Sequence, residues 1–422
     1  MIMRVYIKTF GCSSNKAESE TLAKLLEATG LDTARSLNEA DAIIVNTCTV
    51  RGETDLRILK FLDTLSGKRV VVTGCMAAVQ PALISKHAPT FSIVSPHSLP
   101  SIPFALRSES RSVILRPNET LPEPAPFRSG VKYTIAISRG CLGNCSYCIV
   151  RLARGQLRSI SPKGIMSLIS NAVKGGAWEV RLTAQDTGVY GNDISTDLPT
   201  LLNDVASIEG DFRVRIGMFN PSSVYSLLEP LIESYRSEKI YKFAHLPVQS
   251  GSDRVLMKMN RGYTAESFKR IVGAFRSTFP NFVLFTDVIV GYPGEANEDF
   301  EETCNLIRDT RPDKTHIARF SPRPHTPASS LKQVPETVKK RRSEILTRFT
   351  REIQIANNTQ WVGRVVDATV VDIYRRGGMI ARTDEYKTIA IHRCERSMLG
   401  KRFSIQVNSC TPFYLKGIIT RR

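Results

Sequence analysis

The stretch GCLGNCSYC holds Cys141, Cys145 and Cys148 in CxxxCxxC spacing, directly after a predicted strand. Three thiolates on one short loop can converge on a single soft metal centre. A structural zinc site needs a fourth cysteine or histidine nearby, and the next ones downstream are the distant His245 and Cys304. These three loop cysteines therefore predict a 4Fe–4S cluster with one iron left open for substrate.

A second set of cysteines, here called the sheet cysteines, consists of Cys12, Cys48 and Cys75, at intervals of 36 and 27 residues. Each one lies at the carboxyl end of a predicted buried strand, so all three belong at the carboxyl edge of one parallel sheet. Ligands of open α/β sheets bind at that edge. Two interpretations stay open here: a second metal cluster, or buried core cysteines, which are common.

The elements that carry the sheet cysteines lie in residues 1–108, where short apolar strands alternate with helical patterns. Nearly all-apolar strands separated by helices predict a doubly wound parallel sheet. The expected strands are residues 4–10, 42–48, 69–75 and 91–94. Residues 109–131 contain four closely spaced prolines and are expected to be a linker, because proline discourages helix and internal strand alike.

Residues 132–335, which include the loop cysteines, repeat a strand-then-helix rhythm about six times. The strand candidates are YTIAIS, EVRLTA, FRVRIGM, YKFAHLPV, FVLFTDVIV and KTHIARF. Six β/α units suit a partial β/α barrel rather than a complete eightfold one. A basic helix is expected over residues 336–357, and the β-rich runs of residues 358–422 predict a small antiparallel β-barrel. The expected fold class is α/β with this terminal barrel added.

The chain has a net charge of +18, from 58 Lys and Arg residues against 40 Asp and Glu residues. Over half of the excess lies in residues 336–422, which hold 18 basic and 8 acidic residues. A basic module of this kind most often contacts a polyanion, nucleic acid before a membrane surface. The alternative is a solvated surface without a partner.

Composition excludes several other classes of protein. With 42% hydrophobic and 23% charged residues, the chain is neither mostly disordered nor collagen-like. No apolar run approaches the roughly 18 residues that span a bilayer, and residues 1–10 lack the pattern of a secretory signal peptide. We therefore expect a cytoplasmic protein with no membrane partner. The odd count of nine cysteines also argues against a disulfide framework.

Together, the cysteine motifs and several longer segments resemble the radical-SAM methylthiotransferases. These segments are GCSSN, NTCTV, TGC, SRGCLGNCSYC, HLPVQSGSDRVLMKMNRGYT and TDVIVGYPGEANEDF. The resemblance covers essentially the whole chain, including a terminal barrel similar to a TRAM RNA-binding domain. Within the family, ARGQL, LTAQDTGVYGNDI and RIGMFNPS are most similar to the archaeal and eukaryotic branch. That branch methylthiolates N6-threonylcarbamoyladenosine beside the tRNA anticodon.

The resemblance implies a radical mechanism with two 4Fe–4S clusters. The loop cysteines would hold the cluster that binds S-adenosylmethionine and generates a 5′-deoxyadenosyl radical, which removes the hydrogen from carbon 2 of the adenine. The sheet cysteines would hold an auxiliary cluster that carries the sulfur to be inserted, and a second S-adenosylmethionine would supply the methyl group. The implied partners are tRNA, a flavodoxin-like or ferredoxin-like electron donor and a sulfur source. The oligomeric state stays open, with a monomer as the working expectation.

The resemblance also suggests where S-adenosylmethionine binds. Tyr147 is similar to the aromatic residue beside the adenine in radical-SAM enzymes. Gln185, Gln249 and Gly291 end the second, fourth and fifth predicted strands, so they belong at one mouth of the barrel. The alternative interpretation of each of the four is a strand-end residue whose polar groups hydrogen-bond to the nearby backbone. One departure from the family is RPHTPA in place of RPGTPA, where His325 puts in doubt any role that needs a glycine backbone.

The terminal barrel combines basic side chains, which neutralise phosphates, with aromatic side chains, which stack on loop bases. The basic candidates for RNA binding are Arg375, Arg376, Arg382, Arg393, Arg396, Lys401 and Arg402. Nearby aromatic residues are Tyr374, Tyr386 and Phe403, which a barrel core also requires. The KKRR run at residues 339–342 is either a further phosphate contact or a solvated face. The remaining Cys304, Cys394 and Cys410 match no family ligand and are expected to be structural.

Two rival functions stay open. The first is the same chemistry on another tRNA adenosine or on a ribosomal-protein aspartate. The basic terminal module favours RNA over the protein aspartate. The second is a non-catalytic iron–sulfur protein that binds RNA. The intact CxxxCxxC argues against this second function, because a purely structural site has no use for an open iron.

Overall fold

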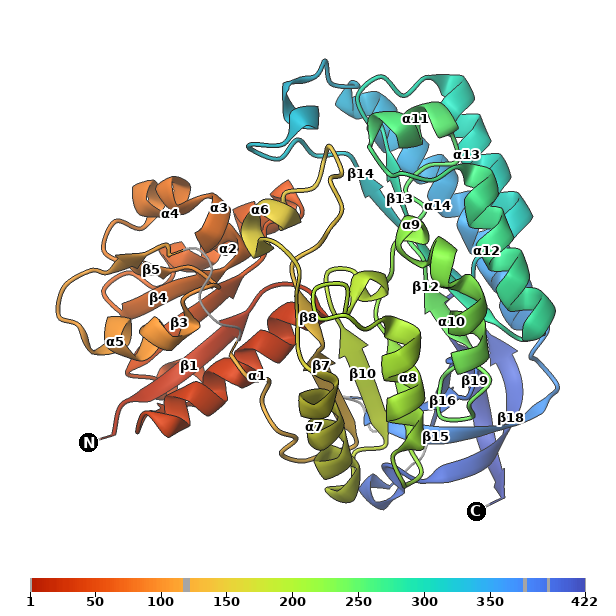
Figure 1. Ribbon diagram of the computed structural model, residues 1–422, viewed down its shortest axis with the longest axis horizontal. Coiled ribbons are helices and arrows are strands. Elements are labelled where there is room, and N and C mark those ends of the chain that lie inside the picture. Colours follow the sequence, from red (N-terminus) through yellow and green to blue (C-terminus); the bar gives the residue numbers. More distant parts are fainter. Residues whose placement is uncertain (1, 117–121, 375–377, 393–394, 422) are drawn as a thin grey trace.

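The computed structural model describes residues 2–116, 122–374, 378–392 and 395–421. Three regions follow one another: an N-terminal α/β lobe, a core of parallel strands and helices, and a C-terminal β-barrel. Figure 1 shows the lobe on the left beside the core, with the β-barrel below the core at lower right. This architecture confirms the predicted fold class. Among the described residues, no helix is both long enough and apolar enough to cross a bilayer.

A six-stranded parallel sheet of order β2-β1-β3-β4-β5-β6 forms the N-terminal lobe. Its strands are β1 (Arg4–Thr9), β2 (Asp32–Thr33), β3 (Ala42–Thr47), β4 (Arg69–Gly74), β5 (Ser92–Val94) and β6 (Val113–Ile114). The sequence predicts four of these strands. The other two, β2 and β6, are two-residue edge strands, too short to show an apolar pattern. β6 lies within the expected proline-rich linker, whose first residues extend the sheet.

Helices cover both faces of this sheet, as the doubly wound prediction requires. α1 and α5 pack on one face, and α2, α3 and α4 pack on the other. Their bounds are α1 (Ser13–Ala28), α2 (Gly52–Asp63), α3 (Cys75–Val79), α4 (Pro81–His87) and α5 (Ile102–Arg107). β3 is buried along its whole length, which is why it is apolar nearly throughout. The winding reverses between β1 and β3, so the carboxyl ends of these strands flank the crevice of the sheet.

Two three-stranded parallel sheets, β11-β10-β7 and β12-β13-β14, form the core. Their bounds are β7 (Lys132–Ala136), β10 (Glu179–Thr183), β11 (Arg213–Ile216), β12 (Phe243–His245), β13 (Val283–Val290) and β14 (Lys314–Arg319). A parallel bridge between Val214 and Ile240 joins the two sheets. The six strands therefore curve into the predicted partial barrel.

Helices surround the outside of this barrel and bury its largest apolar cluster. They are α7 (Pro162–Lys174), α8 (Leu198–Ser207), α10 (Leu228–Ser234), α12 (Ala265–Thr278), α13 (Asn297–Thr310) and α14 (Glu336–Thr359). Shorter elements of the core are β8 (Ser138–Arg139), α6 (Val150–Arg154), β9 (Arg158–Ser159), α9 (Pro221–Val224) and α11 (Asp253–Lys258). The basic helix expected over residues 336–357 is α14, which runs two residues further.

A closed five-stranded barrel of order β15-β16-β17-β19-β18 ends the chain. Its strands are β15 (Val365–Ile373), β16 (Met379–Thr383), β17 (Thr388–Ile391), β18 (Arg402–Cys410) and β19 (Leu415–Arg421). The antiparallel prediction is correct for every pair except β17 with β19, which is parallel. A ring with an odd number of strands cannot alternate direction all the way round, so closure requires one parallel pair.

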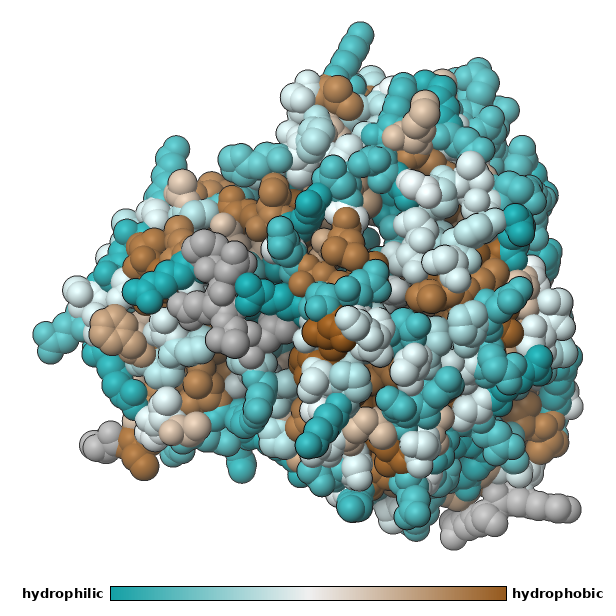
Figure 2. Space-filling view, viewed as in Figure 1, coloured by the Kyte–Doolittle hydropathy of each residue, from teal (hydrophilic) through white to brown (hydrophobic). Residues whose placement is uncertain are grey.

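The terminal barrel closes the amino ends of the core strands. Tyr386 and Val371 of the barrel pack in one buried cluster with Trp178, Tyr241 and Phe243 of the core. On the face of the lobe and core seen in Figure 2, hydrophilic side chains dominate, and apolar ones form separate patches rather than one continuous surface.

Candidate functional site

The loop cysteines follow β8 on a tight turn that only glycine can form. Gly140 has a φ of +83°, and a Cβ at this position would lie 2.0 Å from the carbonyl oxygen of Gln156. The Gly140 N–H donates to the side-chain Oε1 of Gln185 at 2.8 Å, which ties the loop to the end of β10. The carboxyl end of the core strands therefore sets the direction in which the loop leaves the barrel.

The sulfurs of the loop cysteines lie within electrostatic reach of one another. Burial raises the pKa of Cys141 to about 12, and negative charge on Asp186, Cys148 or Cys145 acts in the same direction. The Gly143 N–H donates to the Cys141 sulfur at 3.2 Å. Deprotonated thiolates in such a place need positive charge close by, which a bound metal centre supplies.

Arg261 provides a fixed positive charge beside the loop cysteines. Its Nη1 donates to the Cys145 sulfur at 3.2 Å, while Nη2 donates to Oδ1 of Asn220 at 2.9 Å and Nε to the Tyr263 hydroxyl at 3.0 Å. The guanidinium is buried, so its position is set by these acceptors and not by solvent. A charged donor of this kind stabilises a thiolate ligand.

The structure brings the sheet cysteines to one edge of the N-terminal sheet. Cys12 follows β1 and precedes α1, Cys48 follows β3, and Cys75 begins α3 directly after β4. These three strands are neighbours in the sheet and run parallel. Burial raises the pKa of Cys75 to about 11, and charge on Cys48 or Cys12 acts in the same direction, so the three sulfurs are electrostatic neighbours.

Two buried asparagines hold the chain segments that carry Cys12 and Cys48. Nδ2 of Asn15 donates to Oδ1 of Asn46 at 3.1 Å and to the Thr47 carbonyl at 3.0 Å. In return, Nδ2 of Asn46 donates to the Asn15 carbonyl at 3.0 Å. Oδ1 of Asn15 also accepts from the Cys12 thiol at 3.3 Å. This reciprocal pair fixes the start of α1 against the end of β3.

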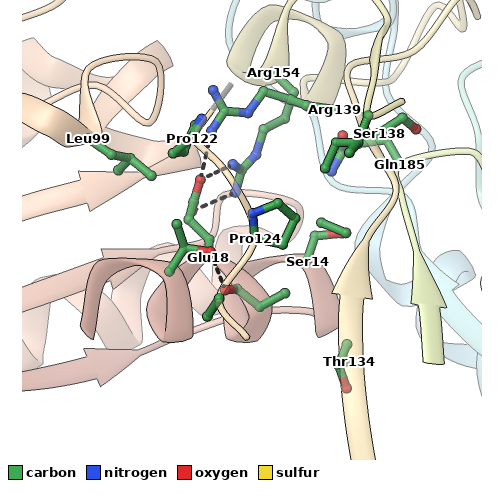
Figure 3. Close-up of a pocket in the computed structure, with 15 residues that line it drawn as sticks. Ser14, Glu18, Leu99, Pro122, Pro124, Thr134, Ser138, Arg139, Arg154 and Gln185 are labelled. Carbon is green, nitrogen blue, oxygen red and sulfur yellow. Dashed lines mark hydrogen bonds and ion pairs between the residues drawn. The ribbon is translucent and has the colours of Figure 1, made fainter. Parts of the chain in front are cut away.

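A buried ion pair joins the sheet cysteines to the core. Arg154 of α6 donates through Nη1 to Oε1 of Glu18 in α1 at 2.6 Å (Figure 3). Its Nε donates to the Cys75 sulfur at 3.2 Å. Arg139 donates to the same Glu18 carboxylate at 3.3 Å. Burial alone would raise the pKa of Glu18, but the two guanidinium groups outweigh it and hold that pKa below its usual value.

The lobe and the core therefore meet beside Cys75. Figure 1 shows α6 beside α3, the helix that begins at Cys75, and the two helices are in contact. Nε2 of His97 in the lobe also lies 3.1 Å from the carbonyl oxygen of Ala153 in α6. A small cavity of about 60 Å³ lies in the same junction and is lined by Ser14, Glu18, Arg139, Arg154 and Gln185, among others.

The residues predicted to bind S-adenosylmethionine have different surroundings. Gln185 uses its side chain to hold the cysteine loop. A Cβ at Gly291 would lie 2.3 Å from Cγ of Lys339, so the glycine allows α14 to pack closely at this point. Tyr147 packs edge-on to Tyr292 with ring centroids 6.5 Å apart. Gln249 has a φ of +70° and pairs through its backbone with β13. Binding of S-adenosylmethionine by all four residues stays a prediction.

His325 occupies a glycine conformation. Its φ is +63°, in the left-handed region, and its side chain is exposed. A glycine, which the family resemblance leads us to expect at this position, adopts such a backbone without strain, and this chain makes the turn with histidine instead.

Several predicted RNA contacts have protein partners. Arg382 lies 4.1 Å from the Tyr386 ring centroid and 3.9 Å from Glu179 of the core. Nη1 and Nη2 of Arg402 donate to Oδ1 and Oδ2 of Asp384 at 3.0 and 2.6 Å. Lys401 is exposed. Arg375, Arg376 and Arg393, like Cys394, lie outside the described residues.

The KKRR run on α14 divides between two faces. Lys339 is buried and donates to the Phe320 carbonyl at 3.1 Å, and Arg342 is buried against Glu295 at 2.6 Å. Lys340 and Arg341 are exposed. The run is therefore neither wholly a phosphate contact nor wholly a solvated face.

Cys304 and Cys410, which belong neither to the loop cysteines nor to the sheet cysteines, are partly buried.

Sequence reasoning missed the residues that support the cysteines: Asn15, Glu18, Asn46, Arg154 and Arg261. Four of them lie within motifs quoted above, GCSSN, NTCTV, ARGQL and the NRGYT of the longer segment, but a motif does not show which side chain meets which sulfur. Glu18 and Arg154 are 136 residues apart, and no local spacing connects them.

Comparison with known families finds three matches along the chain. The uncharacterized protein family UPF0004 matches residues 4–95, the Radical SAM superfamily residues 135–307, and the TRAM domain residues 360–420. Among solved structures, the radical S-adenosylmethionine methyltransferase TsrM from Kitasatospora setae is similar, with a TM-score of 0.57 and 15% identity over 78% of this chain and 77% of that chain. This likeness supports the fold.

Curated relatives match over nearly the full length. A Pyrococcus horikoshii protein named probable threonylcarbamoyladenosine tRNA methylthiotransferase is 38% identical over 99% of this chain and 100% of its own. A Sulfurihydrogenibium protein named tRNA-2-methylthio-N(6)-dimethylallyladenosine synthase is 32% identical over 99% of both chains. The chain belongs to the radical-SAM methylthiotransferase family. It is an enzyme whose chemistry uses an iron–sulfur cluster and S-adenosylmethionine.

Proposed function

We propose that this enzyme inserts sulfur and a methyl group at carbon 2 of N6-threonylcarbamoyladenosine next to the anticodon of tRNA. The observation that carries the substrate is full-length similarity. Identity is 38% to the relative named for threonylcarbamoyladenosine, against 32% to the relative named for dimethylallyladenosine. The segments ARGQL, LTAQDTGVYGNDI and RIGMFNPS support the same branch. The alternative substrates are another tRNA adenosine or a ribosomal-protein aspartate.

We infer that the loop cysteines hold the cluster that binds S-adenosylmethionine and that the sheet cysteines hold a second 4Fe–4S cluster. The donor sets fit: each consists of three thiols, and each has one buried arginine donating to a sulfur. When bound, the two clusters supply the electron for cleavage of S-adenosylmethionine and the sulfur for insertion. The chain itself holds Arg154 beside the sheet cysteines and keeps water from Arg154 and Glu18 by burial.

The TRAM-like barrel and α14 are the proposed tRNA-binding elements, through exposed basic residues such as Lys340, Arg341, Arg396 and Lys401. We propose functional domains at residues 1–108, 132–335 and 358–422, with the linker at 109–131 and the basic helix at 336–357 between them. A flavodoxin-like or ferredoxin-like donor, a sulfur source and a cytoplasmic location complete the proposal.

The deciding experiment for the substrate is mass spectrometry of nucleosides. Anaerobic enzyme with both clusters is incubated with S-adenosylmethionine, a reductant and tRNA that carries threonylcarbamoyladenosine. The expected product is that nucleoside with one methylthio group added. In parallel, tRNA with dimethylallyladenosine and a ribosomal-protein peptide serve as competing substrates. Modification of either competitor and not of threonylcarbamoyladenosine would overturn the substrate assignment.

Iron content tests the two-cluster assignment. Reconstituted wild-type enzyme is expected to carry about eight irons per chain, as two clusters of four. The triple substitution Cys12→Ala, Cys48→Ala and Cys75→Ala should halve this number. The matched control is the double substitution Cys304→Ala and Cys410→Ala, which should leave it unchanged. Full iron content in the triple variant contradicts a second cluster on the sheet cysteines.

A further inference from the structure

Three side chains that the clusters do not use meet inside the core barrel. His245 at the end of β12, Asp287 in β13 and His316 in β14 each offer one ligand atom, and these atoms all lie within 4.8 Å of one another. Nε2 of His245 is 3.0 Å from Oδ2 of Asp287. The imidazole centroids of the two histidines are 5.6 Å apart. All three side chains are partly buried.

Strand register explains why they meet. β13 pairs with β14 so that Asp287 stands beside His316. β12 pairs with β13 so that His245 stands beside Phe285, two residues before Asp287 on the same face. The other face of β13 carries Leu284, Val288 and Val290, which pack under the outer helices. His245, Asp287 and His316, called the triad below, therefore lie on the inner face of the barrel.

The triad occupies a polar level between two apolar ones. On one side, Phe285 belongs to the aromatic cluster that includes Tyr386 of the terminal barrel. On the other side, Ile289 packs against the cluster that contains Tyr292 and borders Tyr147 of the cysteine loop. A polar group enclosed in this way needs partners. Asp287 and His245 provide one hydrogen bond, and His316 adds a second imidazole that a simple His–Asp pair does not require.

Two imidazoles and one carboxylate are the ligand set with which proteins bind divalent first-row transition metals while leaving positions open. We propose that His245, Asp287 and His316 bind one such ion, zinc, iron(II) or manganese(II), inside the barrel. The residues come from three adjacent strands of a rigid sheet, so the ligand atoms are held close together before the ion arrives. Water or an anion would occupy the remaining positions.

The charges around the triad favour an anion in those positions. Arg51 of the N-terminal lobe acts electrostatically on both Asp287 and His316, and Lys314 acts on His316. Asp287 is the one carboxylate of the triad. With a divalent ion in place, the site therefore carries excess positive charge. A carboxylate or a phosphate is the class of ligand that balances it.

Metal content of the cluster-loaded enzyme tests the proposal. Anaerobic enzyme with both clusters assembled is equilibrated with zinc, desalted and analysed for zinc and iron by mass spectrometry. The expected result is one zinc per chain, with iron content unchanged. His316→Ala and Asp287→Asn should each weaken zinc binding about tenfold or more, as loss of a ligand does. X-ray absorption at the zinc edge should show nitrogen and oxygen neighbours and no sulfur.

The control is the exposed pair of His87 and Asp63, which lie 2.7 Å apart on the N-terminal lobe. His87→Ala removes a histidine beside an aspartate and should retain one zinc. If His316→Ala does not fold, His316→Gln keeps a side chain of similar length, and iron content verifies that the rest of the molecule is intact. The proposal is overturned if wild-type enzyme retains no zinc, if the His316 variant retains as much as wild type, or if the zinc has sulfur neighbours.

Discussion

Arg154 and Arg261 occupy matching places beside the two sets of cysteines. Each is buried and donates one N–H to a cysteine sulfur at 3.2 Å. Each is also held by a second acceptor, Glu18 for Arg154 and Asn220 for Arg261. A guanidinium presents several donors in one plane, which lets it bridge a sulfur and an oxygen at once. Lysine, with a single ammonium, cannot reproduce that arrangement.

Arg154→Lys tests this arrangement. Because lysine cannot bind Glu18 and the Cys75 sulfur in the same geometry, we expect affinity for the cluster on the sheet cysteines to fall about tenfold or more. The measurement is iron content after desalting, together with the electron paramagnetic resonance signal of each reduced cluster. Arg35→Lys, at an exposed position of the N-terminal lobe, is the control. Equal iron content and unchanged signals in both variants would contradict the role of Arg154.

His325 offers a second test at the scale of one residue. Its φ of +63° is a conformation that glycine adopts freely and a β-branched residue resists. We expect His325→Gly to raise the free energy of unfolding by up to about 1 kcal/mol and His325→Val to lower it by about 1–2 kcal/mol. Denaturant unfolding of the two variants beside wild type measures the difference. Glycine and valine variants of equal stability would show that the turn is not strained.

At the scale of elements, the terminal barrel docks on the core through charged pairs around an aromatic centre. Asp384 of the barrel accepts from Nε of Arg213 in β11 at 2.9 Å and is also paired with Arg402. Lys387 donates to Asp313 of the core at 2.6 Å. These pairs surround the contact of Tyr386 with Tyr241 and Phe243. The apolar contact supplies most of the binding free energy, and the pairs set the orientation.

The charge of Asp384 makes part of the stability of this docking depend on pH. Burial alone would raise the pKa of Asp384, but Arg402 and Arg213 outweigh it and hold that pKa below its usual value of 3.8. The stabilisation from the charged form is therefore complete above pH 3.8 and is lost as the pH falls through the lowered pKa. Because the carboxylate is partly exposed, we expect Asp384→Asn to cost only about 0.5–1 kcal/mol at pH 7.

The measurement is the difference in thermal stability between wild type and Asp384→Asn as a function of pH. This difference should shrink toward zero in acid. Asp211→Asn is the control, since Asp211 pairs with the same Arg213 at 2.9 Å but has a side chain that is 71% exposed. A difference that persists unchanged to the lowest pH would contradict the assignment to Asp384.

At the scale of the whole molecule, the three regions are joined by buried surfaces. The lobe meets the core through Glu18 and Arg154, and the terminal barrel meets it through the Tyr386 cluster. A deletion of the barrel would expose that cluster and destabilise the core. Loss of tRNA binding in such a truncated chain would not separate an RNA contact from a folding defect.

Point substitutions separate the two effects. Tyr386→Ala empties a buried site and should lower the free energy of unfolding by about 3 kcal/mol. Lys401→Glu changes an exposed charge and should leave stability within about 0.5 kcal/mol while weakening tRNA binding and reducing its salt dependence. Denaturant unfolding and tRNA titrations at several salt concentrations measure both. Unchanged tRNA affinity in Lys401→Glu would remove this residue from the RNA surface.

The sequence by itself determined what depends on local spacing and on strand order. CxxxCxxC places three thiols on one loop, and three β/α repeats carry Cys12, Cys48 and Cys75 to one sheet edge, because parallel strands share their carboxyl ends. The doubly wound lobe, the partial barrel and the closed terminal barrel follow from the same periodic patterns. The pair β17 and β19 departs from the antiparallel expectation, because closure of a five-stranded ring requires one parallel pair. The edge strands β2 and β6 also depart from expectation, because two residues are too few to show an apolar pattern.

Tertiary structure alone decided which residues support the cysteines and which charges are available to a partner. Glu18 reaches Arg154 across 136 residues, and His245, Asp287 and His316 meet only because three strands are in register. Arg382 and Arg342 are basic residues in a basic region, yet each is paired inside the protein. Composition counts these charges but cannot tell which face they occupy. Contacts between distant segments depend on packing, which no local pattern encodes.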